Sequence, residues 1–122
     1  MKQPTRAAIY CRVATPDQLS LDRQEQHVCD FAREKGYEIS SITKEWFKGT
    51  TMTRPGIQRI LADAKNGEMD VLLVYSSSRI GRNTTETMHF IRQLGEYGVA
   101  VESVKEGALL NELLGFIEKT VA

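Results

Sequence analysis

The chain of 122 residues has little cysteine, no net charge and no long apolar run, and each absence excludes a class of protein. Its two cysteines, Cys11 and Cys29, are too few for a disulfide scaffold and lack the companion ligands of a zinc site. We therefore expect two small buried apolar residues, no metal and no cofactor. No stretch approaches the roughly 20 apolar residues of a membrane span, and residues 1–6 carry no signal-peptide block, so we expect a cytoplasmic protein without membrane contact.

The composition is that of a folded domain, with 41% hydrophobic and 26% charged residues. No internal repeat, low-complexity tract or linker divides the sequence, so we expect residues 1–122 to form one domain. The 16 basic residues balance the 16 acidic ones, which removes the simplest electrostatic case for nucleic-acid binding. Any such role must depend on local clustering of Arg and Lys.

The hydrophobic pattern predicts strands alternating with helices. Residues 44–53 have no period and are expected to form a loop. The order of the elements predicts an α/β fold with a mostly parallel central sheet flanked by helices. The predicted strands cover residues 7–13, 37–43, 71–75 and 99–104. The predicted helices run from Ser20, as the N-cap, to Gly36; from Pro55 to Gly67; from Thr84 or Thr85 to Gly95 or Gly98; and from Leu109 to Val121.

Basic and polar residues follow the first and third predicted strands, whose carboxyl ends meet at one edge of a parallel sheet. Arg79 and Arg82 would share one face if their segment were helical, and no acidic residue lies between residues 75 and 86 to neutralise them. Arg12, Arg54 and Lys48 add to this cluster. Phosphate is its natural ligand, because the guanidinium fork donates two hydrogen bonds to phosphate oxygens and keeps its charge. The alternative is a set of solvated surface charges.

Four segments carry motifs that occur together in one family. Residues 10–18 (YCRVATPDQ) and 20–24 (SLDRQ) are similar to Y-x-R-V-S-T-x-x-Q and S-L-x-x-Q. Residues 49–56 (GTTMTRPG) are similar to G-T-S-x-x-R-P-G, residues 70–74 to the third strand, and residues 78–83 (SRIGRN) to D-R-L-G-R-N. In this order and spacing the chain resembles the serine recombinases, the resolvase and invertase family, over about residues 6–106. The resemblance implies a resolvase-like catalytic domain.

The resemblance also implies site-specific recombination of DNA, in which a serine hydroxyl attacks a phosphodiester and forms a phosphoserine link without metal or ATP. Tyr10 and Gln18 would line the site. Glu45 falls where the family often places a carboxylate, although Lys44 fills this position in an alternative alignment. Four arginines would grip the scissile phosphate and stabilise the charge of the transition state: Arg12, Arg54, Arg79 and Arg82.

Two positions depart from the family pattern. Ala14 stands in place of the nucleophilic serine, and because a methyl group has neither a lone pair nor a proton to give, we predict that this chain does not cleave DNA. Either deliberate inactivation or a natural relative that binds without cutting fits this alanine. Ser78 stands where the pattern has aspartate. Its hydroxyl can accept a hydrogen bond from Arg79 or Arg12 but offers no charge, so the positioning carboxylate is lost or replaced by Glu45.

Family members continue into a long dimerisation helix and a separate DNA-binding module. We expect this chain to end before both, to contact DNA weakly through its phosphate backbone, and to act as a dimer or tetramer in the full-length protein. A non-catalytic DNA-associated or oligomerisation module of the same fold is the first alternative. An unrelated flavodoxin-like domain that binds a phosphorylated small molecule is the second, although the chain has no G-x-G-x-x-G and no Walker A lysine motif.

Overall fold

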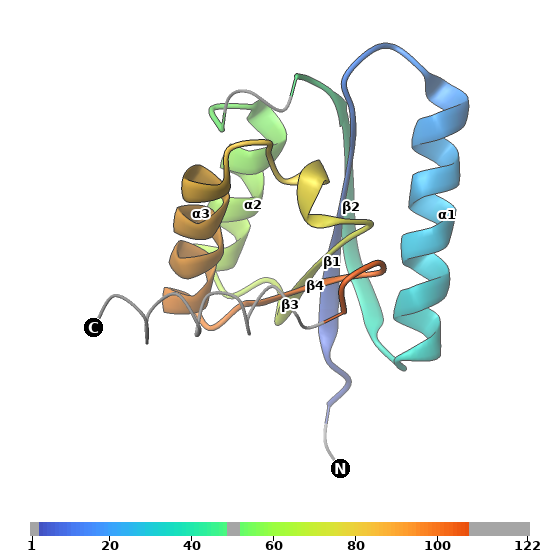
Figure 1. Ribbon diagram of the computed structural model, residues 1–122. Coiled ribbons are helices and arrows are strands. Elements are labelled where there is room, and N and C mark those ends of the chain that lie inside the picture. Colours follow the sequence, from blue (N-terminus) through green and yellow to red (C-terminus); the bar gives the residue numbers. More distant parts are fainter. Residues whose placement is uncertain (1–2, 49–51, 108–122) are drawn as a thin grey trace.

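A computed structural model describes residues 3–48 and 52–107, along which strands and helices alternate (Figure 1). In chain order the elements are β1 (Arg6–Val13), α1 (Gln18–Glu34), β2 (Glu38–Trp46), α2 (Pro55–Lys65), β3 (Val71–Val74), the short 3₁₀ helix η1 (Ser77–Arg79), α3 (Thr84–Glu96) and β4 (Ala100–Ser103). The helix predicted over residues 109–121 lies outside the described residues. Within those residues, no helix has the length and apolar character needed to cross a membrane.

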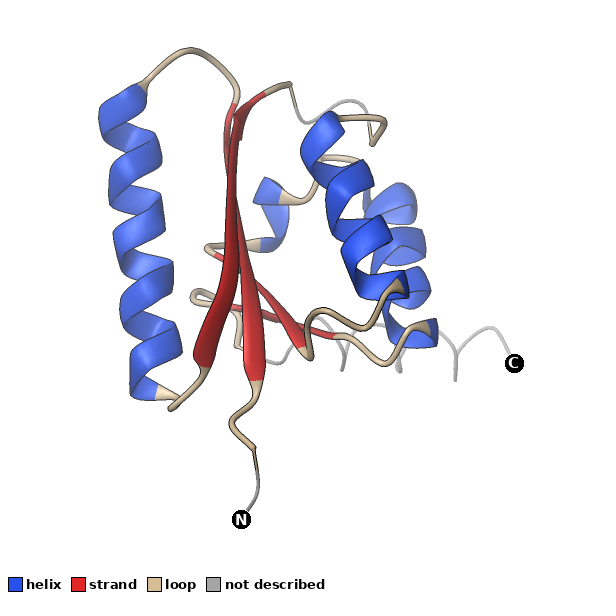
Figure 2. Ribbon diagram, turned by 180° about the vertical axis from the view of Figure 1, so that it is seen from behind, coloured by secondary structure: helices blue, strands red, loops and turns tan. Residues whose placement is uncertain are grey.

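The strands form one sheet in the order β2-β1-β3-β4, and every neighbouring pair is parallel. Parallel neighbours need crossover connections, and here helices provide them. Figure 2 shows α1 on one face of the sheet and α2 and α3 on the other. The predicted α/β architecture, a mostly parallel central sheet flanked by helices, is therefore confirmed.

The core lies on both faces of the sheet because helices cover both. Tyr10 of β1 packs in the cluster with α2 and α3, whereas Ile9 and Cys11 pack in the cluster with α1. Cys29 of α1 belongs to this second cluster. Both cysteines are free and buried, as predicted, and burial raises the pKa of the Cys11 thiol to about 12.

The first helix begins earlier than predicted. The carboxylate of Asp17 accepts the backbone N–H of Ser20 at 3.1 Å and its hydroxyl at 2.7 Å, so Asp17 is the N-cap and the assignment of Ser20 was wrong. The predicted end of α1 is confirmed, since Gly36 has a φ of 74°, which favours glycine after a helix. Helix α2 begins at Pro55 as predicted, and α3 begins at Thr84, one of its two predicted starts.

The second strand is longer than predicted, and this moves a candidate site residue onto the sheet. The loop assignment was wrong for residues 44–46, because β2 continues to Trp46 in register with β1. Arg12 pairs with Glu45 in this register. Exposed and half-buried residues alternate along β2, so the sequence gives little sign of where pairing stops. The third and fourth strands end slightly short of their predicted limits.

Strand β1 extends past its shorter neighbour β3. It pairs with β3 only from Ala7 to Ile9, whereas it pairs with β2 as far as Val13. Beyond Ile9, the Gln24 amide of α1 takes the place of a strand, accepting the Arg12 N–H at 3.0 Å and donating to the Arg12 carbonyl at 3.0 Å. Because β3 ends before β1 does, η1, which follows β3, lies beside the end of β1 (Figure 1).

Candidate functional site

The polar segment after β3 presents three consecutive backbone carbonyls to two buried arginines. The carbonyls of Ser78 and Arg79 accept hydrogen bonds from Arg12, and that of Ile80 accepts one from Arg54. The last carbonyls of a helix have no partner within it, and a 3₁₀ helix of one turn leaves most of its acceptors free. The two guanidinium groups supply these partners and thereby fix η1 against the end of β1.

Arg12 lies in β1 with only 3% of its surface exposed. Its Nε donates to the Arg79 carbonyl at 2.9 Å, its Nη2 to the Ser78 carbonyl at 2.7 Å and its Nη1 to the Phe47 carbonyl at 2.7 Å. Burial lowers the pKa of this guanidinium. The positive charges of three nearby residues lower the pKa of Arg12 further: Arg54, Arg79 and Arg82. The structure thus brings all four predicted arginines together at one end of the sheet.

Arg54, the residue before α2, is completely buried. Its guanidinium carbon lies 5.6 Å from the centre of the Tyr10 ring, and its Nε lies 3.8 Å from Oε2 of Glu45. Its Nη2 donates to the Ile80 carbonyl, whereas its Nε and Nη1 have no hydrogen-bond acceptor among the described residues. A buried cation requires an opposite charge nearby, and Glu45 provides it.

Glu45 joins three parts of the site. It accepts the Tyr10 hydroxyl at 2.5 Å and the backbone N–H of Gly56 at 2.9 Å. A Cβ at Gly56 would lie 2.5 Å from Glu45 Oε2, so only glycine admits the carboxylate here. These contacts explain the R-P-G motif, in which Arg54 pairs with the carboxylate, Pro55 begins α2 and Gly56 gives the carboxylate room. Burial, and then the hydrogen bond to Glu45, raise the pKa of Tyr10.

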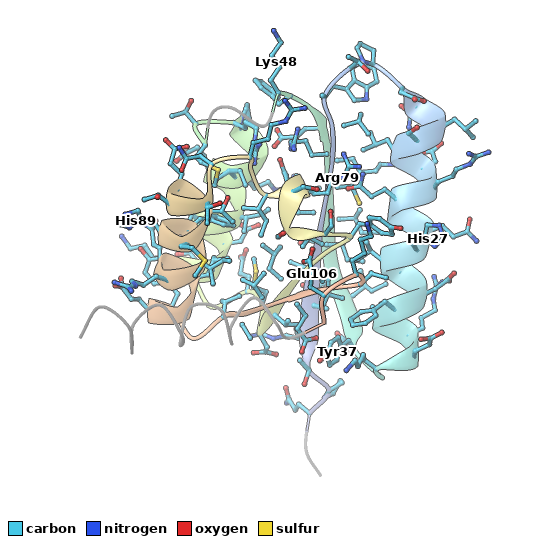
Figure 3. All side chains as sticks on the ribbon, viewed as in Figure 1. His27, Tyr37, Lys48, Arg79, His89 and Glu106 are labelled. Carbon is cyan, nitrogen blue, oxygen red and sulfur yellow. The ribbon has the colours of Figure 1, made fainter. Side chains whose placement is uncertain are left out.

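Arg79 and Arg82 are more accessible than the other two arginines. Helix η1 ends at Arg79, and Arg82 is exposed in the turn that follows, so the expectation of a shared helix face was wrong. Nη1 of Arg79 donates to the Arg12 carbonyl at 3.3 Å, and its Nε is buried without an acceptor among the described residues. Figure 3 labels Arg79 beside η1 and Lys48, the other predicted member of the cluster, farther toward the same end of the sheet.

Ala14 follows β1 directly and is exposed. Gln18, the first residue of α1, is also exposed, and its amide donates to Asp22 of its own helix at 2.8 Å. It borders a surface pocket that Glu45 and Trp46 also line. Ala14 is therefore open to a ligand, and Gln18 is accessible at the start of α1.

Ser78 does not meet an arginine through its hydroxyl. Its Oγ lies 2.8 Å from Oγ of Ser76, and its backbone carbonyl is the atom that accepts from Arg12. The expectation that the Ser78 hydroxyl accepts from an arginine was therefore wrong, because the backbone carbonyl of Ser78 is the acceptor. Glu45 is the carboxylate that pairs with an arginine of the cluster, and its partner is Arg54.

Two residues that stabilise the site received no role in the sequence analysis. Gln24 holds the free edge of β1 at Arg12, and its place in the SLDRQ motif was the signal that could have found it. Glu106 accepts the backbone N–H of Ser77 at 3.0 Å and the Ser103 hydroxyl at 2.7 Å, which ties η1 to the end of β4. No sequence pattern marks Glu106. The described residues include no group of three His, Cys, Asp or Glu side chains placed to hold a metal ion.

Comparison with known proteins identifies the family of this chain. A family model described as the resolvase N-terminal domain matches residues 7–117. The serine recombinase PinR of Escherichia coli is 30% identical over 109 residues, which make up 86% of this chain and 52% of that protein. The transposon Tn552 resolvase of Staphylococcus aureus is 28% identical over 103 residues, or 84% of this chain and 48% of that protein. The chain spans about half the length of these curated relatives.

Solved structures agree with this result. The N-terminal catalytic domain of TP901-1 integrase superimposes with a TM-score of 0.81 at 26% identity, covering 94% of this chain and 95% of that one. The C-terminal catalytic domain of ISC1926 TnpA, an IS607-like serine recombinase, gives a TM-score of 0.76 at 28% identity, covering 94% and 82%. The likeness extends over nearly the whole chain in both cases.

Proposed function

Because the chain belongs to the resolvase family of serine recombinases, we propose that it is the catalytic domain of a site-specific DNA recombinase and that it cannot itself cut DNA. The observation that carries this proposal is Ala14, which follows β1 and stands where the family motif has its nucleophilic serine. A methyl group supplies neither the attacking oxygen nor the proton that must leave it. A DNA phosphate can therefore enter the site without forming a covalent link.

The charge of the site suits this phosphate chemistry. When an oxygen attacks a phosphodiester, negative charge builds on the phosphoryl oxygens and on the leaving oxygen. Fixed positive groups at that position stabilise the charge without having to reorganise during the reaction. The guanidinium groups of Arg54, Arg79 and Arg82 lie near enough to Arg12 for their positive charges to lower its pKa, so the end of the sheet that β1 reaches beside Ala14 is strongly basic.

We assign these arginines to two layers. Arg12 and Arg54 are 3% and 0% exposed and donate to carbonyls of η1 and of Ile80, the residue after it. They therefore hold this segment in place and add positive electrostatic potential from the protein interior. Arg79 and Arg82 are accessible and would donate directly to phosphate oxygens. Because the inner pair lies in a medium of low dielectric constant, its charge acts on the phosphate more strongly than the same charge in water.

Glu45 and Tyr10 act as positioning residues in this proposal. Glu45 lies 3.8 Å from Arg54 and accepts the Tyr10 hydroxyl, so it orients the buried arginine in the way that Ser78 cannot. Gln18, exposed at the start of α1 and bonded to Asp22 of its own helix, would contact DNA only at the edge of the site.

The partner we propose is DNA, held mainly through its phosphates and therefore weakly and with strong salt dependence. In a longer protein the domain would act as part of a dimer or tetramer. We propose a cytoplasmic location, and a reaction in relatives that uses no metal or cofactor.

Replacing Ala14 with serine tests the proposal. The Ala14→Ser variant, joined to the DNA-binding module of a relative and mixed with that module's target site, should form a covalent protein–DNA adduct visible as a shifted band on a denaturing gel. The unchanged Ala14 chain in the same fusion should form none. The double variant Ala14→Ser with Arg79→Gln serves as the matched control for the surrounding site and should lose most of the adduct.

If Ala14→Ser forms no adduct while the fusion still binds its site, the catalytic assignment is wrong. The chain is then a non-catalytic DNA-associated or oligomerisation module of the same fold. The burial of Arg12, whose three nitrogens donate to backbone carbonyls, and of Arg54, whose Nη2 does so, is the observation that favours this second candidate.

A further inference from the structure

A second basic pocket lies on the other face of the sheet, between α1 and the carboxyl ends of β1 and β3. It has a volume of about 180 Å³, and its walls come from β1, α1, η1 and the residue after β3. We propose that this pocket binds a second phosphate of the DNA backbone, beside the phosphate that reaches position 14. The proposal rests on the function proposed above and extends it. The side chains that matter are Arg23, His27, Tyr75 and Arg79.

The charges around the pocket favour an anion. Arg23 and Arg79 both line it, and none of the described residues that line it carries a carboxylate. Arg23 forms no ion pair with any described residue, so its charge is available to a ligand. Asp17 is a competing negative charge, but its carboxyl pKa is lowered chiefly by its hydrogen bonds to Ser20 and only in a lesser part by Arg23. That carboxylate is committed to capping α1.

Arg79, which lines the pocket, does not have all its donors satisfied within the protein. Its Nε is buried and has no acceptor among the described residues. A buried donor without an acceptor leaves the positive charge of this guanidinium incompletely balanced, which favours an anion beside it. Arg79 thus has a hydrogen bond to the Arg12 carbonyl through Nη1 and a free donor in Nε.

The remaining wall is aromatic. The rings of His27 and Tyr75 pack with their centres 5.7 Å apart, which places the imidazole of α1 against the residue that follows β3. Figure 3 labels His27 on α1 and Arg79, the last residue of η1. Aromatic walls reduce the local dielectric constant and strengthen the attraction between the guanidinium groups and an anion.

The place of the pocket identifies the source of the phosphate. Val13 forms part of its wall, and Ala14, the next residue, is the position that receives the scissile phosphate in the proposed function. A DNA strand with one phosphate at Ala14 would therefore lie beside this pocket, and a neighbouring phosphate of the same strand is the anion that we propose for it. Arg23 and His27 occupy variable positions of the SLDRQ stretch and the helix after it, so this second contact belongs to this chain's own sequence and not to the shared motif.

Titration of the 122-residue chain with inorganic phosphate, followed by nuclear magnetic resonance, tests whether the pocket exists as an anion site. Signals of His27, Arg23 and Arg79 should shift together and saturate. Arg23→Gln should weaken phosphate binding about tenfold, the loss expected for one charge-assisted contact. Arg33→Gln is the matched control, because Arg33 lies on the same helix near its other end and is mostly exposed, and it should leave binding unchanged. Equal effects of the two variants, or no shift at His27, would overturn the proposal.

A short DNA duplex then distinguishes a backbone phosphate from a free one. Arg23→Gln should reduce the dependence of log affinity on log salt by about one phosphate contact, whereas Arg33→Gln should not. If Arg23→Gln weakens inorganic phosphate but leaves the salt dependence unchanged, the pocket serves a small free phosphate compound and the DNA assignment is wrong. Adduct formation by Ala14→Ser reports on the proposed function separately, since that reaction needs no contact at Arg23.

Discussion

The inner and outer sides of η1 use the same residue type in opposite ways. On the inner side, Arg12 and Arg54 are buried and give their donors to backbone carbonyls. On the outer side, Arg79 is half-buried and Arg82 is exposed. The difference shows that an arginine cluster recognised in a sequence contains two kinds of group, those that build the site and those that can reach a ligand.

The physical reason lies in what surrounds each guanidinium. A buried arginine is stabilised by a nearby opposite charge and by acceptors for its donors. Glu45 supplies the charge beside Arg54, and backbone carbonyls accept from Arg12 and from Nη2 of Arg54. An exposed arginine is already solvated and can exchange water for phosphate oxygens at little cost. Mutations on the inner side should therefore change stability first, and those on the outer side should change binding first.

The largest effect is expected for Arg54→Met. Among the described residues, Arg54 is the one cation that pairs with Glu45, so the variant leaves a carboxylate that is 10% exposed without its partner. Loss of one partner from a buried pair costs about 3 to 5 kcal/mol, so the free energy of unfolding in urea should fall by that amount.

The double variant Arg54→Met with Glu45→Gln sharpens this test, because it removes the buried charge as well. It should recover part of the lost stability. A double variant that is less stable than Arg54→Met would show that Glu45 does not depend on Arg54, and the two-layer interpretation would then be wrong.

Tyr10→Phe should have an intermediate effect that depends on pH. It removes the hydroxyl that donates to Glu45 at 2.5 Å, at a cost of about 2 kcal/mol near pH 7. Burial raises the pKa of Tyr10 above its ordinary value of 10.0, so its contribution is complete below pH 10 and is lost as the pH rises above 10. Urea unfolding from pH 7 to 11 should show the variant losing less stability above pH 10 than the original chain. Tyr97→Phe, at an exposed site, is the control.

The smallest effect on stability is expected for Arg82→Gln. An exposed arginine in a turn contributes within about 0.5 kcal/mol, so urea unfolding should be almost unchanged. Its binding to duplex DNA should weaken, and the salt dependence should fall by about one phosphate contact. If Arg82→Gln lost as much stability as Arg54→Met, the proposed difference between the inner and outer arginines would be wrong.

Much of the fold could be predicted because local patterns and long-range packing agree. The all-apolar run Val71–Val74 is a strand that is buried throughout, and proline begins α2 as its preferred position requires. The length of β2 could not be predicted in the same way. Residues 44–46 are strand because β1 pairs with them, and no periodicity in those three residues reports on a neighbour.

The candidate site also has features that the sequence could predict and features that it could not. The motifs identified the four arginines, Tyr10 and Glu45 as a set, and the structure places their members at one end of the sheet. The shared helix face of Arg79 and Arg82 failed as a prediction because η1 is a single turn fixed by contacts to Arg12, Arg54 and Glu106. Such contacts join residues far apart in the chain and leave no local pattern.

The order of residues alone was enough to specify the alternating elements, the family and the absence of a nucleophilic hydroxyl at Ala14, since each depends on local periodicity or on the chemistry of a single side chain. Which arginines are buried, which carbonyls they meet and which donors stay free depended on the packed molecule. Burial and hydrogen-bond partners arise only when β1, β2 and η1 come together in three dimensions, and these contacts separate the arginines that support the site from those that can reach a phosphate.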